Sequence, residues 1–190
     1  MRIGLFGGSF DPPHVGHYLA AVDAFESLAL DRLDFIPAAR QPLKPKGHAA
    51  GAAARIALLQ AMVADDPRFS VNQVEIDRGG LSFTVDTAES YHAAGDGHTL
   101  FLLLGTDAAS QLAGWKEPER LLRLVQLVVL TRGAEPFAPV GLGRDALVLA
   151  TRRVDVSSTE VRRRVSEGRP LRGFVLDAVA EQIRRMALYR

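Results

Sequence analysis

The first seventeen residues constrain the fold more than any other stretch of the chain. Residues 1–6, MRIGLF, have the pattern of a short apolar strand and run directly into residues 7–17, GGSFDPPHVGH. Gly7 and Gly8 lack a Cβ atom, so the turn can adopt positive φ and a ligand can approach the main chain closely. The helix that follows begins with unpaired N–H groups and a partial positive charge. The sequence therefore predicts a strand, a glycine turn and a helix start that together bind phosphate.

Two histidines stand inside this predicted anion site. His14 and His17 are three residues apart, so on one helical turn they point to the same side. The main alternative is a metal site in which Asp11, His14 and His17 supply three ligands and leave one position open for catalysis. Two glycines ahead of the pair favour a phosphate site over a metal site.

Composition bounds the kind of protein. A chain of 190 residues, 47% hydrophobic and 24% charged, is long enough for one domain with a real core, so we expect a single domain over 1–190. The lack of cysteine excludes disulfides and fits a cytoplasmic location. Neither a signal peptide nor a run of about 20 apolar residues is visible, so no membrane contact is expected. A net charge of +1 argues against a broad nucleic-acid surface.

Hydrophobic periodicity predicts the fold class. The order strand, helix, strand at the start of the chain predicts a right-handed βαβ unit, and so an α/β, Rossmann-like open sheet that is mostly parallel with helices on both faces. Strands are expected at 1–6, 33–37, 69–76, 99–104 and 124–130, and helices at 15–30, 52–64, 85–94, 108–113 and 174–188. A C-terminal helical part covers about 157–190, with Val175, Val179, Ile183 and Met186 expected to face the core.

Three further stretches are weaker site candidates. Residues 78–84, RGGLSFT, form a second glycine turn before a helix, with Ser82 or Thr84 as the expected N-cap. Asp107 follows the strand 99–104, at the edge where open parallel sheets bind ligands, and either bonds a ribose hydroxyl or caps a helix. Trp115, the only tryptophan, either packs against the core or stacks on a flat aromatic substrate.

Two basic segments also have two interpretations each. The loop 38–50, which carries Lys44, is either a solvated surface loop or a functional lid. In residues 156–164, VSSTEVRRR, Ser157 and Glu160 fit a capping box of an ordinary helix. The hydroxyls, the free N–H groups and Arg162 at that helix start also suit a polyphosphate.

The motif at 14–17, HVGH, resembles the H-x-G-H signature of the nucleotidyltransferase superfamily. Within that superfamily the chain is similar to the bacterial nicotinate mononucleotide adenylyltransferases. The supporting marks span nearly the whole chain in order, at residues 78–87, 105–107, 112–115, 156–162 and 188–189. Two departures appear: Phe83 stands where the family usually has tyrosine, and the loop around Lys44 lacks the usual paired prolines.

The resemblance implies adenylyl transfer from ATP to nicotinate mononucleotide, giving deamido-NAD and pyrophosphate in NAD biosynthesis. It implies Mg²⁺ as a companion of ATP, no metal held by the protein itself, two small-molecule substrates as partners, and leaves a homo-oligomer open. It assigns His14 and His17 to catalysis. It assigns ATP binding to Gly7, Gly8, Ser9, Phe10, Lys44, Gly105, Asp107, Arg132, Ser157, Ser158 and Arg162, and nicotinate mononucleotide binding to Ser82, Phe83, Thr84 and Trp115.

Three alternatives to this function remain at the level of sequence. Two are sister enzymes, a pantetheine-phosphate adenylyltransferase and a cytidylyltransferase, and the third is a non-catalytic nucleotide sensor, because fold does not fix function. The helix start near Thr84 adds one expectation about substrate. A carboxylate gains more than a neutral carboxamide from the unpaired N–H groups and the helix dipole, so nicotinate should be preferred over nicotinamide.

Overall fold

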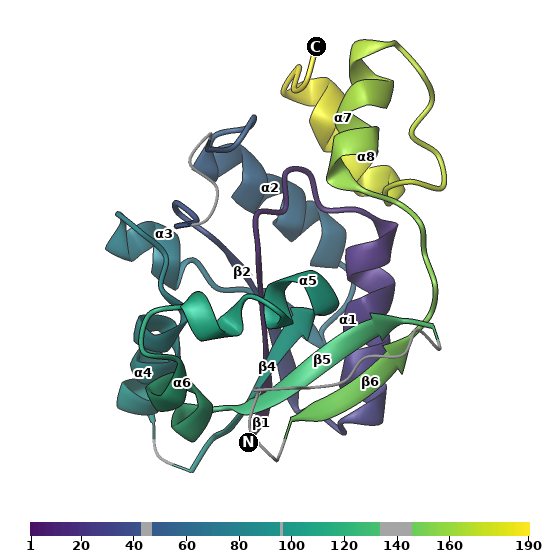
Figure 1. The fold of residues 1–190 in the computed structure, drawn as a ribbon. Coiled ribbons are helices and arrows are strands. Elements are labelled where there is room, and N and C mark those ends of the chain that lie inside the picture. The colour runs from purple at the N-terminus through teal and green to yellow at the C-terminus, as the bar shows by residue number, and fades with distance from the viewer. Residues whose placement is uncertain (43–46, 96, 134–145) are drawn as a thin grey trace.

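The computed structural model describes residues 1–42, 47–95, 97–133 and 146–190. Helices and strands alternate along most of the chain (Figure 1). The elements are β1 (Arg2–Gly8), α1 (Val15–Ser27), β2 (Arg32–Pro37), α2 (Ala52–Val63), β3 (Phe69–Val71), α3 (Val74–Arg78), α4 (Thr84–Ala94), β4 (Thr99–Gly105), α5 (Thr106–Ala109), the 3₁₀ turn η1 (Leu112–Gly114), α6 (Pro118–Leu124), β5 (Gln126–Arg132), β6 (Leu147–Thr151), α7 (Ser158–Ser166) and α8 (Asp177–Arg185).

The six strands form one sheet in the order β3-β2-β1-β4-β5-β6, and every neighbouring pair is parallel. The predicted α/β fold with an open parallel sheet is therefore confirmed. The strand order reverses between β1 and β4, where the chain leaves one half of the sheet for the other. Ligands of such sheets bind beyond the carboxyl ends of the strands at this reversal. The turn after β1 and the segment after β4 both lie there.

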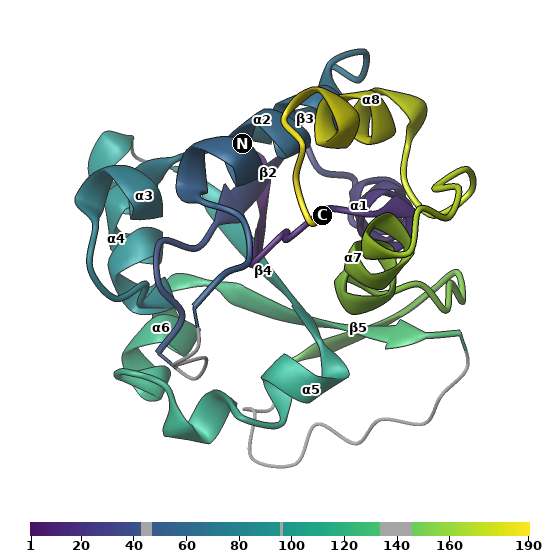
Figure 2. The ribbon, with the colours of Figure 1, turned by 90° about the horizontal axis from the view of Figure 1, so that it is seen from above.

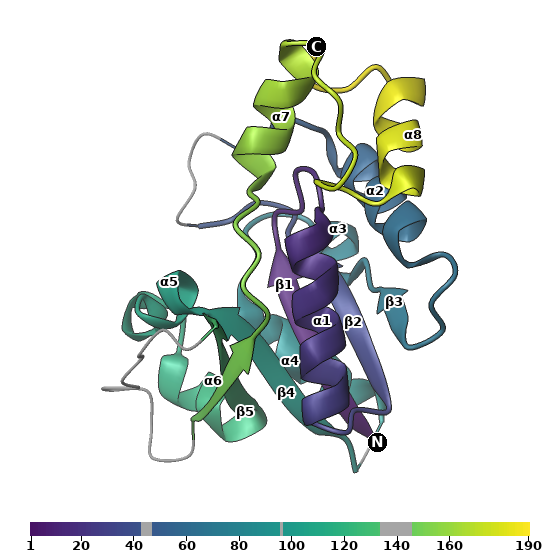
Figure 3. The same ribbon diagram turned by 90° about the vertical axis from the view of Figure 1, so that its right-hand side faces the viewer.

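The sheet is covered on both faces because its strands present apolar side chains to both. Successive residues of a strand point to opposite faces. In β4, Phe101 and Leu103 belong to the hydrophobic cluster under α1 and α2. Leu100, Leu102 and Leu104 belong to the cluster under α4 and α6. Figure 3 shows α1 on one side of the strands and α4 on the other. The central strands are consequently buried almost from end to end.

Helices α7 and α8 stand at the carboxyl end of the sheet, next to the turn after β1 (Figures 1 and 2). Val161 of α7 and Val179 and Ile183 of α8 are buried in the same apolar cluster as Phe10 of that turn. This packing brings the last residues of the chain to the first turn.

The predicted strand 69–76 is wrong in its second half. Strand β3 ends at Val71, and residues Val74–Arg78 form helix α3. The side-chain oxygen of Asn72 accepts a 3.0 Å hydrogen bond from the backbone N–H of Val74. Asparagine commonly makes such a local bond, which turns the chain and starts the helix.

The predicted N-cap of the helix 85–94 is also wrong. Phe83 occupies the N-cap position of α4 and makes no side-chain capping bond. The Ser82 hydroxyl instead accepts a 2.9 Å hydrogen bond from the backbone N–H of Ala39, and the Ser82 N–H donates to the carbonyl of Arg40. These two bonds tie the second glycine turn to the segment that follows β2.

Several element ends differ from the prediction. Helix α1 ends at Ser27 rather than residue 30, and Ala29 beyond it has a positive φ of 45°. The predicted helix 108–113 is divided into α5 and η1, and the predicted helix 174–188 is shortened to α8. Met186, expected to face the core, is 37% exposed. Helix α6 and strand β6 were not predicted.

Candidate active site

The turn after β1 is shaped by a buried phenylalanine. Phe10 is 1% exposed and has a positive φ of 48°, so the left-handed backbone that was expected at the glycines lies at Phe10 instead. A Cβ atom on Gly8 would lie 2.9 Å from the Phe10 ring, whereas a Cβ on Gly7 would meet nothing within 4 Å. Gly8 is therefore required by packing, and Gly7 leaves open space where a ligand can approach the main chain.

His14 and His17 lie together at the start of α1, as their spacing predicts. Their ring centroids are 3.7 Å apart, and the backbone N–H of His14 donates a 3.2 Å hydrogen bond to Nδ1 of His17. Because Nδ1 of His17 accepts this bond, it carries no proton, and the neutral ring must carry its proton on Nε2. The turn thus fixes His17 as a donor through Nε2.

Both imidazoles are neutral at neutral pH. Burial, followed by the charge of Arg132, lowers the pKa of His14 to about 4. Burial, then His14 and then Arg132, holds the pKa of His17 well below 6.5. Arg132, at the end of β5, is exposed and close enough to act on both rings. The site thus offers two neutral ring donors beside one fixed positive charge, a combination that suits a phosphate chain.

Asp11, between the glycines and the histidines, is buried, and both oxygens of its carboxylate accept hydrogen bonds. Its oxygens accept hydrogen bonds from the backbone N–H groups of Ala49 and Ala50, at 2.6 and 3.1 Å, and from the hydroxyl of Tyr189 at 2.8 Å. The carboxylate therefore fixes the turn. These three bonds compete with the role of metal ligand that the alternative site gives to Asp11.

Arg55 of α2 also stabilises this turn. It was not identified as a site residue from the sequence. It is 1% exposed and donates hydrogen bonds to the carbonyls of Ser9 and Ala38, at 2.9 and 2.8 Å. Burial lowers the pKa of Arg55, and the negative charge of Asp11 acts in the opposite direction. One signal in the sequence pointed to it: the spacing of Arg55, Leu58 and Leu59 places the arginine on the otherwise apolar face of the helix.

The start of α7 contacts the turn directly. Ser157 is the N-cap and its hydroxyl accepts from the N–H of Glu160, so the predicted cap is confirmed. The Ser158 hydroxyl donates to the carbonyl of Pro12 at 2.7 Å, and Arg162 donates to the carbonyl of Asp11 at 2.6 Å. The structure therefore brings these residues to the histidine turn, with part of their donor capacity already used to hold it.

A pocket of about 490 Å³ opens beside the turn, at the carboxyl ends of β1 and β4. Its wall joins Gly7 and Gly8 to most of the residues expected around the ribose and the pyridine, namely Ser82, Phe83, Thr84, Asp107 and Trp115. Gly105 is the N-cap of α5, one residue before Thr106 and two before Asp107, and Asp107 lies in the first turn of α5 rather than at its cap. Trp115 is half-buried and packs against the apolar cluster under α4, which leaves part of it in the pocket wall.

Two further predictions concern Lys44 and the alternative metal site. Lys44 lies outside the residues that the structure describes. In the described ranges, no group of three or more His, Cys, Asp or Glu side chains is arranged to hold a metal ion. None of the helices in those ranges has the length and apolar character that a bilayer crossing requires.

Comparison with known proteins gives a consistent assignment. Residues 5–164 match the cytidylyltransferase-like family. A protein of Gemmatimonas aurantiaca named as a probable nicotinate-nucleotide adenylyltransferase is 51% identical, over all of this chain and 93% of its own length. A Thermus thermophilus protein of the same name is 45% identical over the full length of both chains.

The fold has a close counterpart among solved structures. The Plasmodium falciparum nicotinic acid mononucleotide adenylyltransferase complexed with NaAD superposes with a TM-score of 0.80, covering 99% of this chain and 97% of that one at 15% identity. At that identity the likeness concerns the fold. The sequence matches show that the chain belongs to the cytidylyltransferase-like family and, within it, to the nicotinate-nucleotide adenylyltransferases.

Proposed function

We propose that this chain transfers the adenylyl group of ATP to nicotinate mononucleotide, giving deamido-NAD and pyrophosphate in NAD biosynthesis. The relatives that match over its full length carry the name of this activity. The observation that carries the proposal is the placement of two paired histidines next to a pocket whose wall includes Gly8, Thr84 and Trp115. One end of this site suits a triphosphate and the other a flat aromatic ring.

The reaction needs positioning and charge stabilisation rather than a covalent nucleophile. An oxygen of the mononucleotide phosphate attacks the α-phosphorus of ATP, and the bond from that phosphorus to the bridging oxygen breaks in line. Pyrophosphate leaves with the electron pair of the broken bond. Donors aimed at the oxygens where negative charge develops accelerate such a step. Nε2–H of His17 is such a donor, since its tautomer is fixed before the substrate arrives.

The remaining phosphate contacts come from three elements in this proposal. His14 and the main chain from Gly7 to Phe10 hold the α- and β-phosphates, and Arg132 adds the positive charge that already acts on both rings. Ser157, Ser158 and Arg162 take the outer phosphates at the start of α7. The start of α7, a helix of nine residues, favours an anion, although the N–H of Glu160 already donates to the Ser157 hydroxyl and the Glu160 carboxylate partly offsets the helix dipole. Lys44 is the additional basic group proposed from the sequence.

The nucleoside ends occupy the pocket. Gly105 and Asp107 hold the adenosine ribose, and the ring of Trp115, the Ser82 and Phe83 turn and the start of α4 at Thr84 hold the nicotinate. Mg²⁺ bound with ATP would neutralise phosphate charge, and it would prefer oxygen ligands from the phosphates and water. The carboxylate of Asp11 is already engaged by hydrogen bonds, which fits a metal that enters as part of the substrate. The proposal includes a cytoplasmic location, where ATP is available.

A pyrophosphate-release assay tests this function. ATP and CTP are each supplied with nicotinate mononucleotide, nicotinamide mononucleotide and phosphopantetheine. We expect release with ATP and nicotinate mononucleotide. Release only with phosphopantetheine or only with CTP would assign a sister enzyme instead, and ATP binding without any release would assign a sensor.

A further inference from the structure

The pocket wall contains one cationic side chain among its described residues. That residue is Lys116, which directly follows Trp115, and the acidic residues of the same wall are Glu75 and Asp107. Glu75 is buried and already receives a 2.8 Å hydrogen bond from the Thr87 hydroxyl, with the charge of Arg78 close by. Glu75 thus has its own partners and is not the counter-charge of Lys116.

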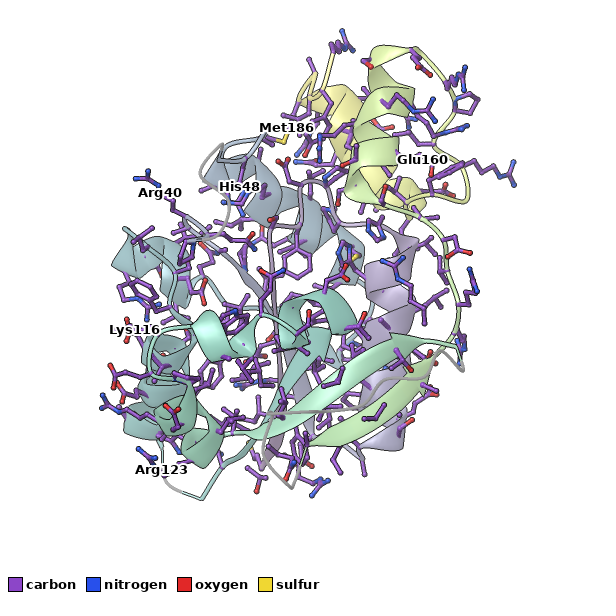
Figure 4. The ribbon with its side chains drawn as sticks, in the orientation of Figure 1. Arg40, His48, Lys116, Arg123, Glu160 and Met186 are labelled. Carbon is purple, nitrogen blue, oxygen red and sulfur yellow. The ribbon has the colours of Figure 1, made fainter. Side chains whose placement is uncertain are left out.

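Lys116 is held at the start of α4 by two contacts. Its ammonium lies 4.9 Å from the centroid of the Phe83 ring and 2.8 Å from Oδ1 of Asp86. The side chain of Lys116 is 39% exposed and that of Asp86 is 29% exposed, so solvent and a ligand can still reach the pair. Figure 4 labels Lys116 on the side of the molecule that carries α4 and α6.

The contact with Asp86 changes the electrostatics of the helix start. Asp86 stands in the first turn of α4 and by itself offsets the positive end of the helix, which would repel an incoming carboxylate. Lys116 neutralises Asp86 and leaves the unpaired N–H groups near Thr84 attractive to an anion. The ammonium also remains over the Phe83 ring face, where a cation–π contact fixes it without consuming its remaining donors.

We propose that Lys116 is a specificity-determining residue that selects a pyridine mononucleotide with a carboxylate over one with a neutral carboxamide. The inference rests on the proposed function and adds to it the group that distinguishes the two pyridines. The ammonium donates a hydrogen bond to the carboxylate while it keeps its contacts with Phe83 and Asp86. A carboxamide gains less from the same ammonium because it carries no charge.

The test compares three variants of the full chain. Lys116→Gln removes the charge, Lys116→Arg keeps it, and Arg120→Gln removes a nearby charge whose partners, Glu89 and Glu117, lie outside the pocket wall. The measurement is kcat/KM with each of the two mononucleotides at saturating ATP. We expect Lys116→Gln to lower the nicotinate-to-nicotinamide ratio about fivefold, the effect of one accessible charge pair. The change should appear in KM for nicotinate mononucleotide, with the KM for ATP unaltered.

The controls separate this inference from the proposed function. Lys116→Arg and Arg120→Gln should keep the parent ratio within about twofold, consistent with a role for charge at position 116 alone. An unchanged ratio in Lys116→Gln, with full turnover, overturns the inference and leaves the activity intact. If the parent turns over neither mononucleotide, the proposed function fails. In that case the inference is tested by binding alone, with the fluorescence of Trp115, the only tryptophan, as the signal for nicotinate mononucleotide. Equal Kd values for the parent and Lys116→Gln overturn the inference.

Discussion

The hydroxyl of Tyr189 donates a 2.8 Å hydrogen bond to Oδ1 of Asp11, although the two residues are 178 positions apart. Tyr189 is the penultimate residue of the chain, and Asp11 lies three residues before His14. Burial and the neighbouring Asp11 raise the pKa of Tyr189, so the phenol stays protonated and donates at all physiological pH values. Tyr189 therefore fixes the turn that carries His14 and His17.

Replacing Tyr189 with phenylalanine should lower kcat about three- to tenfold and cost about 1 kcal/mol of stability, because Asp11 loses one of three donors. The measurements are kcat, the KM values and the free energy of unfolding in urea. The matched control is Tyr18→Phe, which removes a 2.8 Å hydrogen bond to Asp66 that does not reach the turn. Equal kcat values in the two variants would show that the Tyr189 hydroxyl stabilises the fold without positioning the site.

Replacing His17 with alanine should lower kcat by about 10²–10³, the scale for removing one donor to a developing charge. The fold should remain, because within the described part of the chain the His17 side chain has a single hydrogen bond, which it accepts from the N–H of His14. The comparison variant is His92→Ala. The ring of His92 in α4 contacts the carbonyl of Leu124 in α6. His92→Ala should keep kcat, and a loss in His17→Ala no larger than in His92→Ala would place the donor elsewhere.

The lowered pKa of His14 predicts a specific pH dependence of stability. The unfolded chain takes up a proton on this ring near pH 6.5, whereas the folded chain resists protonation until about pH 4. The unfolded state therefore binds more protons in this window, and stability is complete above pH 6.5 and falls as the pH drops below it. Between pH 7.5 and 5, the parent should lose about 2 kcal/mol more than His14→Gln in urea unfolding. Parallel pH curves for the two proteins would contradict the burial of a neutral His14.

Replacing Arg55 with methionine should cost about 2–4 kcal/mol of stability, because the buried carbonyl of Ala38 and the partly buried carbonyl of Ser9 lose their donor and Asp11 loses a neighbouring charge. Arg55→Lys should recover only part of this loss, since one ammonium cannot reach the carbonyls of Ser9 and Ala38 as the planar guanidinium does. Arg184→Met serves as the surface control, because the side chains of Arg184 and Glu181 are 66% and 68% exposed. Thermal and urea unfolding measure all three variants. A loss in Arg55→Met as small as in Arg184→Met would refute its structural role.

Local patterns in the sequence were enough to predict much of this protein. The strand, glycine turn and histidine pair at 1–17 and the cap at Ser157 depend on neighbouring residues, and the structure contains both. The continuous apolar run at residues 100–104 in β4 likewise predicts a strand buried on both faces. Where local bonds compete, the same reasoning was wrong: Asn72 ends β3 early, and Ser82 bonds Ala39 rather than the start of α4.

The tertiary structure alone decided which distant residues support the site. Nothing in the spacing of Asp11, Arg55 and Tyr189 shows that they meet, because a hydrogen bond across 178 residues depends on how the helices pack. The pairing of Lys116 with Asp86 likewise requires the packing of α4 against α6. Sequence determines local backbone geometry through neighbouring side chains, whereas the burial that shifts the pKa values of His14 and His17 exists only once the chain has packed.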